Sequence, residues 1–193
     1  MWSDNPNGAL VSEIGGLAPG RALDVGAGEG GDAIWLAEQG WTVTASDIST
    51  RALARIRAEA DRRRLRVECL HADANALAAW PSAAFDLVSA HYASIPRTPD
   101  HRGVRNVLDA VAPGGTLLVV SHDLAPMRVP VDTLTHSQAF DPDAYVVVDD
   151  FVEALAGSPD WEIRTRGKHT RPAGAASTHH VDDIILRASR RAV

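Results

Sequence analysis

The sequence predicts an α/β fold: a three-layer sandwich in which helices cover both faces of a seven-stranded, mostly parallel sheet. Two observations carry this prediction. Short apolar runs alternate with helical patterns over most of the chain, which is typical of a parallel sheet covered on both faces. Near the C-terminus, two strand patterns follow one another with no helical pattern between them, so the last strand is expected to pair antiparallel to its neighbours.

The first part of the chain is expected to form three helices and three strands, each helix bounded by a recognisable signal. Pro19-Gly20 ends the first helix, and Gly40 ends the second. Ser49 or Thr50 caps the third, whose apolar residues recur with helical spacing. The expected elements are a helix over about 8–17, a strand over 21–25, a helix around 33–37, a strand over 41–45, a helix from 50 with Leu53, Ile56 and Ala60 on its apolar face, and a strand over 65–70.

The rest of the chain is expected to complete the sheet around a long irregular segment. A helical pattern over 104–111 is ended by Pro113-Gly114-Gly115, and the apolar run over 116–121 indicates a central, buried strand. Residues 122–145 show no periodicity and are expected to cap the substrate, because such long loops in compact domains are usually functional. The remaining expected elements are a strand over 85–90, a helix capped by Asp149 or Asp150 that carries Phe151, Val152 and Leu155, and strands over 161–166 and 181–188.

Composition narrows the class of protein. The 193 residues suit one domain over 1–193, and the net charge of −6 argues against a nucleic-acid partner. A single cysteine, Cys69, allows no internal disulfide and is expected to be a small buried residue. Neither a signal peptide nor an apolar stretch of membrane-spanning length is visible in the sequence. We therefore expect a cytoplasmic protein without membrane or nucleic-acid partners, either a monomer or a homodimer.

A glycine-rich loop is the most informative segment. The run over 22–31 follows the first expected strand and opens a helix, and its glycines let a ligand approach the backbone closely. Two fingerprints overlap there: the dinucleotide pattern Gly26-x-Gly28-x-x-Gly31 and the adenosylmethionine pattern Asp24-x-Gly26-x-Gly28-x-Gly30. The glycines alone therefore leave both cofactors open.

Two carboxylates flank this loop. Asp47 closes the second expected strand, where a carboxylate can accept hydrogen bonds from both ribose hydroxyls of either cofactor; the alternative is that it only caps the next helix. Asp24 discriminates between the cofactors, because a carboxylate would repel the pyrophosphate of a dinucleotide. S-Adenosylmethionine instead brings a sulfonium and an ammonium group, both cations. The sequence therefore favours S-adenosylmethionine.

Together with further motifs, these residues resemble the class I S-adenosylmethionine-dependent methyltransferases over nearly the whole chain. The resemblance implies a Rossmann-like fold with strand order 3-2-1-4-5-7-6. The motifs that carry it are Asp24-Val25-Gly26-Ala27-Gly28-Glu29-Gly30, Asp47, His71-Ala72-Asp73-Ala74, Phe85-Asp86-Leu87-Val88 and Ala112-Pro113-Gly114-Gly115. The segments 29–37 and 40–43, with Trp2-Ser3 and Asn5-Pro6-Asn7, are most similar to the tellurite-resistance and thiopurine-type branch, which acts on small molecules.

The resemblance also implies the cofactor site and the reaction. Asp73 is expected against the adenine amino group. The expected cofactor-binding residues are Asp24, Gly26, Ala27, Gly28, Gly30, Asp47, Ile48, Asp73, Ala74 and His91. The expected reaction transfers the methyl group of S-adenosylmethionine to a sulfur, oxygen, nitrogen or chalcogen nucleophile of a small molecule and gives S-adenosylhomocysteine.

Methyl transfer needs a base only when the nucleophile arrives protonated; otherwise the enzyme mainly aligns the reactants and excludes water. His91 directly follows the strand over 85–90 and is the candidate base, because the ordinary pKa of histidine is about 6.5. The alternative is that His91 only lines the pocket. Tyr92 is expected as a wall of the site. His122-Asp123 is expected as a surface loop, with a second base as the alternative.

Two other functions stay open: an NAD(P)-dependent oxidoreductase and a non-catalytic module that binds S-adenosylmethionine. No metal site is expected, because the sequence has no cysteine cluster and no helical histidine pair. His179-His180 would point to opposite faces of a strand, which makes a poor chelate. His136 falls in the expected cap.

Overall fold

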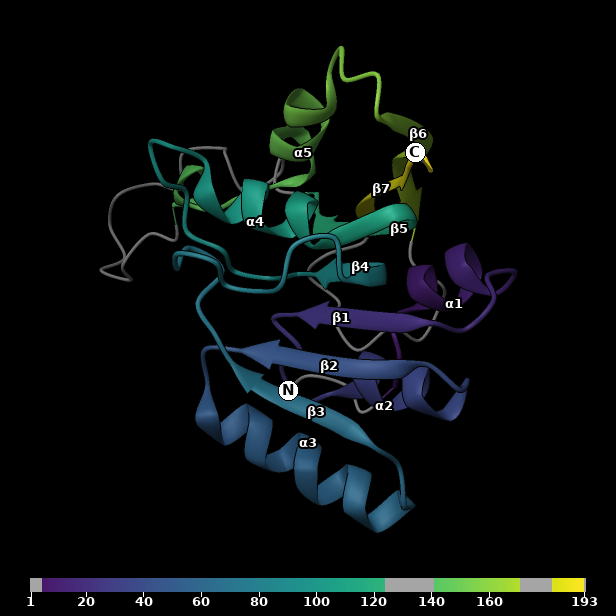
Figure 1. Ribbon diagram of the computed structural model, residues 1–193. Coiled ribbons are helices and arrows are strands. Elements are labelled where there is room, and N and C mark those ends of the chain that lie inside the picture. Colours follow the sequence, from purple (N-terminus) through teal and green to yellow (C-terminus); the bar gives the residue numbers. More distant parts are fainter. Residues whose placement is uncertain (1–4, 124–140, 171–181, 193) are drawn as a thin grey trace.

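The computed structural model describes residues 5–123, 141–170 and 182–192, in which seven strands form one sheet (Figure 1). Their order is β3-β2-β1-β4-β5-β7-β6; the strands from β1 to β5 run parallel, and β7 pairs antiparallel with both β5 and β6. The expected fold class, strand order and antiparallel last strand are thus confirmed. The strands are β1 (Arg21–Val25), β2 (Thr42–Asp47), β3 (Val67–His71), β4 (Phe85–His91), β5 (Val111–His122), β6 (Trp161–Thr170) and β7 (Asp182–Arg190).

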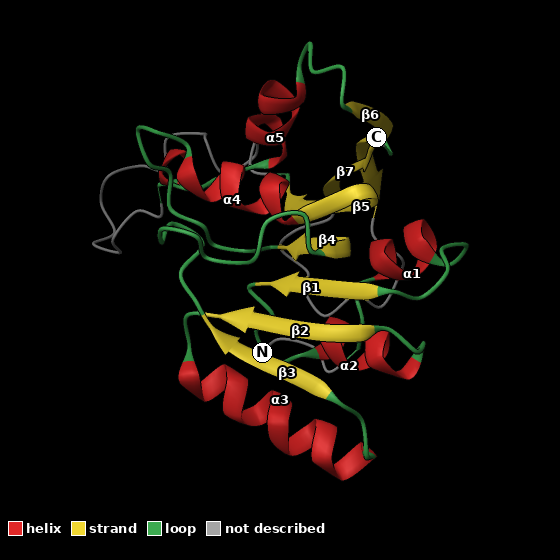
Figure 2. Cartoon of the chain, viewed as in Figure 1, coloured by secondary structure: helices red, strands yellow, loops and turns green. Residues whose placement is uncertain are grey.

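Helices cover both faces of the sheet and bury two apolar layers (Figure 2). One layer packs under α1, α2 and α3, and the other under α4 and α5. Leu117 and Leu118, neighbours in β5, are fully buried on opposite faces, which explains the continuous apolar run in this strand. The helices are α1 (Gly8–Ile14), α2 (Gly31–Glu38), α3 (Thr50–Arg63), α4 (Arg102–Ala110), the 3-10 helix η2 (Pro142–Ala144) and α5 (Val148–Leu155).

Three expected boundaries are wrong. The first helix was expected to reach about residue 17 and to end at Pro19-Gly20, but α1 ends at Ile14, with Gly15 as its C-cap. The helical pattern was expected to reach Val111, but α4 ends at Ala110, and Val111 already pairs with Phe85 in the sheet. Val111 is fully buried, and a buried position of a helix or of a strand would equally call for an apolar residue. Its apolar character therefore could not separate the helix from the strand. α5 is not capped by Asp149 or Asp150. Its N-cap is Val147, whose backbone N–H donates to the Asp150 carboxylate over 2.7 Å from the third helical position.

Several expectations fall wholly or partly outside the described residues. They include most of the cap over 122–145, together with His136, His179-His180 and Trp2-Ser3. Of the cap's described residues, His122 ends β5 and Pro142–Ala144 forms η2. Over the ranges that the structure describes, no helix combines the length and apolar character needed to span a membrane, and no cluster of three potential metal ligands occurs.

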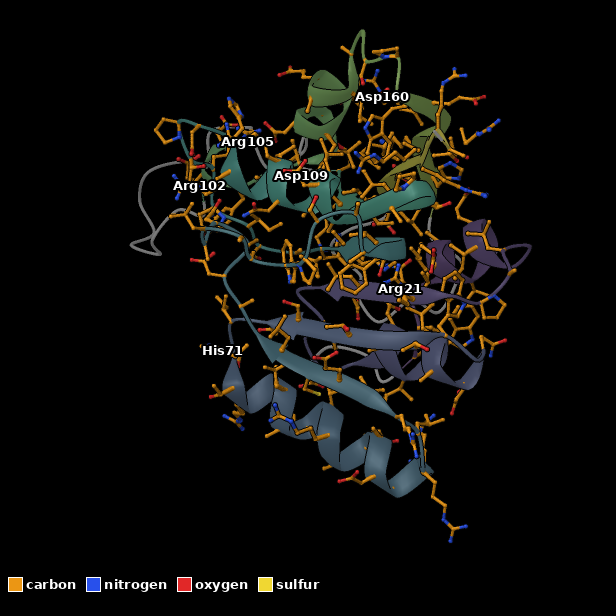
Figure 3. All side chains as sticks on the ribbon, viewed as in Figure 1. Arg21, His71, Arg102, Arg105, Asp109 and Asp160 are labelled. Carbon is orange, nitrogen blue, oxygen red and sulfur yellow. The ribbon has the colours of Figure 1, made fainter. Side chains whose placement is uncertain are left out.

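The parallel strands bring their C-terminal ends to one edge of the sheet. Figure 3 shows Arg21 at the start of β1 and His71 at the opposite edge, where β3 ends. Along the chain, β1 is followed by β2 and β3 on one side of it, and β4 and β5 then lie on the other side. This reversal between β1 and β4 is the place where open α/β sheets bind ligands, beyond the carboxyl ends of the strands.

Candidate functional site

The glycine loop is tied to the end of β2. Gly26 and Ala27 donate their backbone N–H groups to the Ser46 carbonyl, over 2.8 and 3.1 Å. Gly28 donates its N–H to Oδ2 of Asp47 over 2.9 Å, and Ser49 donates to Oδ1 over 2.7 Å. Two backbone donors therefore fix the Asp47 carboxylate, and each oxygen keeps a lone pair for a further donor such as a hydroxyl.

Glycine is required at two positions of this loop. Gly30, the N-cap of α2, has φ of 88°, and a Cβ there would lie 2.6 Å from Cγ1 of the fully buried Ile56. Gly26 has φ of 68°, and its Cβ would lie 3.0 Å from the Cβ of Ala93, just beyond β4. The loop thus packs tightly against α3 on one side and against the segment after β4 on the other.

The segments after β2 and β3 meet where the adenine amino group is expected. Nε2 of His71 lies 2.9 Å from the Ile48 carbonyl, and the Ile48 side chain is 67% exposed although it is large and apolar. Asp73 accepts the N–H of Asn75 over 2.8 Å, which shapes the turn, and Asn106 of α4 donates to the Ala74 carbonyl over 2.7 Å. An exposed apolar side chain beside an anchored polar turn suits a flat heteroaromatic ring.

Asp24 is buried at the end of β1, and its two oxygens differ. Oδ1 accepts a hydrogen bond from the Ser89 hydroxyl over 3.3 Å, whereas Oδ2 has no hydrogen-bond partner among the described residues. Burial, with the nearby Asp32 carboxylate as the next cause, raises the pKa of Asp24 to about 7. His91, the cationic group that acts on Asp24, is already paired with Asp32, so Asp24 is short of positive charge that a cationic ligand would supply.

His91 ends β4 on the same face and is held by an acid that the sequence did not single out. Its Nδ1 lies 2.5 Å from Oδ2 of Asp32 in α2, and the two side chains are only 4% and 14% exposed. Oδ1 of Asp32 accepts the backbone N–H of Asn7 over 2.5 Å, so the segment before α1 is attached to the same carboxylate. Nε2 of His91 is buried and has no hydrogen-bond partner among the described residues.

The environment of His91 acts on its pKa in two directions. Burial alone would lower the pKa, but the charge and hydrogen bond of Asp32 outweigh it, and the resulting pKa lies above the ordinary value. The Asp32 carboxylate also fixes the ring orientation and leaves Nε2 to face other groups. This is the arrangement of a positioned imidazole that can exchange a proton at Nε2.

A second cluster lies where β4 and β5 end and β7 begins. The Tyr92 hydroxyl donates to Oδ2 of Asp183 over 2.7 Å, and the Tyr92 ring stacks on His122 with centroids 4.2 Å apart. Nδ1 of His122 lies 3.6 Å from Oδ1 of Asp183. Tyr92 has φ of 53°, a strained conformation for a non-glycine residue, and these contacts hold it there. His122 is therefore part of β5 and of this cluster, not of a surface loop.

Sequence reasoning missed Asp32 and Asp183. Asp32 lies in the first turn of α2, where an acidic residue is explained by the helix dipole alone. Its partner His91 is 59 residues away, so only the fold reveals the pair. Asp183 begins the last strand with no motif around it, and the antiparallel register places it opposite His122.

A small recess opens beyond β4 and β5, beside α5. It is small, because the space open to a water-sized molecule is about 20 Å³. Ser121 and Tyr92 are the polar residues among the described ones that line it, and no charged side chain does. The apolar lining residues include Ala93, Ile95 and Phe151.

The sequence over residues 22–115, just under half of the chain, matches a family described as a methyltransferase domain. An uncharacterized protein of Mycobacterium tuberculosis is 34% identical over 118 residues, which cover 60% of this chain and 42% of that relative. A protein of Mycobacterium bovis matches to the same extent. The chain thus spans less than half the length of these curated relatives.

Solved structures share the whole fold. A structure described for the conversion of a disulfide bond into a thioacetal group during echinomycin biosynthesis has a TM-score of 0.72 and 25% identity, over 97% of this chain and 82% of that one. An S-adenosylmethionine-dependent methyltransferase from Mesorhizobium loti has a TM-score of 0.67 and 20% identity, over 94% and 96%. Residues 22–115 are thus similar to a methyltransferase domain, and the chain shares the fold of solved S-adenosylmethionine-dependent methyltransferases.

Proposed function

We propose that this protein transfers the methyl group of S-adenosylmethionine to a nucleophile on a small molecule and releases S-adenosylhomocysteine. The proposal starts from the match of residues 22–115 to a methyltransferase domain and from the shared fold. The observation that carries the proposal is the buried Asp24 carboxylate beside the glycine loop, because its Oδ2 has no partner within the described residues. A sulfonium or ammonium group would satisfy this oxygen, whereas a pyrophosphate would be repelled. Asp24 therefore supports adenosylmethionine over a dinucleotide.

The cofactor-binding residues are proposed on the same grounds. The anchored Asp47 carboxylate would accept the ribose hydroxyls, and the exposed Ile48 and the turn at Asp73 and Ala74 would contact the adenine. Gly26, Ala27, Gly28 and Gly30 would let the cofactor approach the backbone, and Asp24 and His91 would face its charged end. When bound, the cofactor supplies an activated methyl group.

His91 is proposed as the group that takes the acceptor's proton. Asp32 holds Nδ1, so Nε2 is the nitrogen that remains for proton transfer. A thiol, selenol or phenol that arrives protonated would need this base, whereas an acceptor that is already anionic would not.

The acceptor class is proposed to contain a soft sulfur or chalcogen atom, as the tellurite-resistance and thiopurine branch suggests. A structure described for sulfur chemistry in echinomycin biosynthesis shares the fold, which supports this choice without fixing it. We also propose a small-molecule acceptor and a cytoplasmic location, and the net charge of −6 supports the first of these over a nucleic acid.

The proposal is tested by incubating the protein with S-adenosylmethionine and a panel of thiols, phenols and chalcogen oxyanions. The measurement is the formation of S-adenosylhomocysteine and of the methylated acceptor by mass spectrometry. We expect acceptor-dependent turnover, and His91→Gln should lower the rate about a hundredfold for acceptors that are protonated at the assay pH. Asp61→Asn, on the exposed face of α3, is the matched control and should leave the rate unchanged. Tight cofactor binding with no turnover for any acceptor would contradict the proposal and favour a non-catalytic module.

A further inference from the structure

The site contains two buried polar atoms that no described residue satisfies. They are Oδ2 of Asp24 and Nε2 of His91. The other oxygen of Asp24 accepts a hydrogen bond from Ser89, and the other ring nitrogen of His91 is paired with Asp32. Each side chain therefore has one polar atom with a partner and one without among the described residues. Buried polar groups are nearly always paired in folded proteins, so two such atoms in one site indicate a missing ligand.

The charges around these atoms do not balance. Asp24 from β1 and Asp32 from α2 share one imidazole, that of His91 from β4; full ionisation would leave a net negative charge in a buried place. The other charged groups that act on this cluster are Asp47 from β2 and Asp183 from β7, and both add negative charge. Without a ligand, the cluster is therefore expected to retain a proton near neutral pH.

Resting on the proposed function, we propose that S-adenosylmethionine and a proton compete for the Asp24–Asp32–His91 cluster, so that binding of the cofactor releases a proton. The cofactor brings positive charge to a buried group that lacks it, and an opposite charge nearby favours the ionised carboxylate. The protonated free protein binds the cofactor, and this gives the complex and one proton released to the solution. No bond other than the one to this proton breaks.

The competition fixes how affinity depends on pH. Burial raises the pKa of Asp24 to about 7 in the free protein. Below that pH a proton must be displaced, so the affinity for S-adenosylmethionine should fall, by up to about tenfold for each pH unit. Above that pH the cluster has already lost the proton, and the affinity should level off.

Proton release is measured by calorimetric titration of the full chain with S-adenosylmethionine in phosphate and in imidazole, which both buffer near pH 7 and whose ionisation enthalpies differ. The titrations are made one pH unit below and one above the Asp24 pKa of about 7. At the lower pH, the observed binding enthalpy should differ between the two buffers in the sense of proton release. At the higher pH, the difference should shrink while the affinity rises.

Two variants and one spectroscopic measurement assign the proton to the cluster. Asp24→Asn should bind the cofactor more weakly, and its affinity should change less with pH, because only His91 is left to titrate in the cluster. Asp61→Asn should behave as the unmodified protein. If Asp24→Asn binds too weakly for calorimetry, the His91 ring resonance followed against pH replaces it. In the unmodified protein, its titration step should move to lower pH when S-adenosylmethionine is added.

The outcomes separate the two proposals. No binding of S-adenosylmethionine at any pH overturns the proposed function and this inference with it. Binding without proton release, with a flat affinity and an unmoved His91 titration, overturns only the inference. Proton release that is undiminished in Asp24→Asn while the His91 titration stays unmoved also overturns it, because the proton would then come from outside the cluster.

Discussion

At the scale of single residues, three aspartates near one sheet edge differ sharply in their surroundings. Asp47 is fixed by the N–H groups of Gly28 and Ser49, Asp32 is paired with His91, and Asp24 is buried with one oxygen unsatisfied among the described residues. Their environments suit them to different tasks: holding neutral hydroxyls, orienting an imidazole and facing a cation. Sequence could identify Asp24 and Asp47 because they border the glycine loop, but the task of Asp32 depends on tertiary contacts.

The Asp32–His91 pair makes a prediction about pH. The negative charge of Asp32 raises the pKa of His91, so methyl transfer to a protonated acceptor should rise with pH through a value above the ordinary histidine pKa. Asp32→Asn removes that charge, and the inflection of the pH–rate profile should move to lower pH while the plateau rate falls. The measurement is the pH dependence of kcat/KM for S-adenosylmethionine with a thiol acceptor, because this ratio reports the pKa values of the protein before the cofactor binds.

Glu38→Gln, at the end of the same helix, is the control for Asp32→Asn. Glu38 pairs with Arg63 on the surface and does not contact His91. Its pH–rate profile should match that of the unmodified protein. An unchanged inflection in Asp32→Asn would show that the pair does not set the protonation of the base.

At the scale of elements, the turn from β1 into α2 places the site. Its conformation depends on Gly30, whose φ of 88° and close approach to Ile56 leave no room for a side chain. Gly30→Ala should lower the free energy of unfolding by about 1 to 3 kcal/mol, because it adds both overpacking and backbone strain. Denaturant unfolding measures this change.

Gly16→Ala is the matched control for that turn. Gly16 has nothing within 4 Å of the position that a Cβ would occupy. Its unfolding free energy should stay within about 0.5 kcal/mol of the original. Equal stability of Gly30→Ala and Gly16→Ala would contradict the packing of the loop against α3.

Elements with strong periodicity were predictable, whereas their boundaries were not. α3 was found from Ser49, which accepts the N–H of Ala52, and from the buried Leu53 and Ile56. The junction of α4 and β5 was misplaced because Val111 is equally apolar in a helix or a strand. What separates the two is the pairing of Val111 with Phe85, which is a tertiary contact.

At the scale of the whole molecule, the order of the strands brings distant residues to one edge. β1 and β4 are neighbours in the sheet, so Asp24 and Ser89 pair in register and His91 follows on the same face. The alternation of helices and strands predicted a parallel sheet, and the resemblance to methyltransferases implied this order. The same order places β7 beside β5 and so creates the Tyr92–His122–Asp183 cluster. No sequence motif predicted this cluster.

The central claim is that this edge binds S-adenosylmethionine and not a dinucleotide. The most direct test is calorimetric titration with S-adenosylhomocysteine, with NAD titrated in parallel and Asp47→Asn as the variant. We predict binding of S-adenosylhomocysteine alone, weakened about tenfold or more by Asp47→Asn, which removes a charged acceptor for the ribose. Binding of NAD alone, or an affinity for S-adenosylhomocysteine that Asp47→Asn leaves unchanged, would contradict the account.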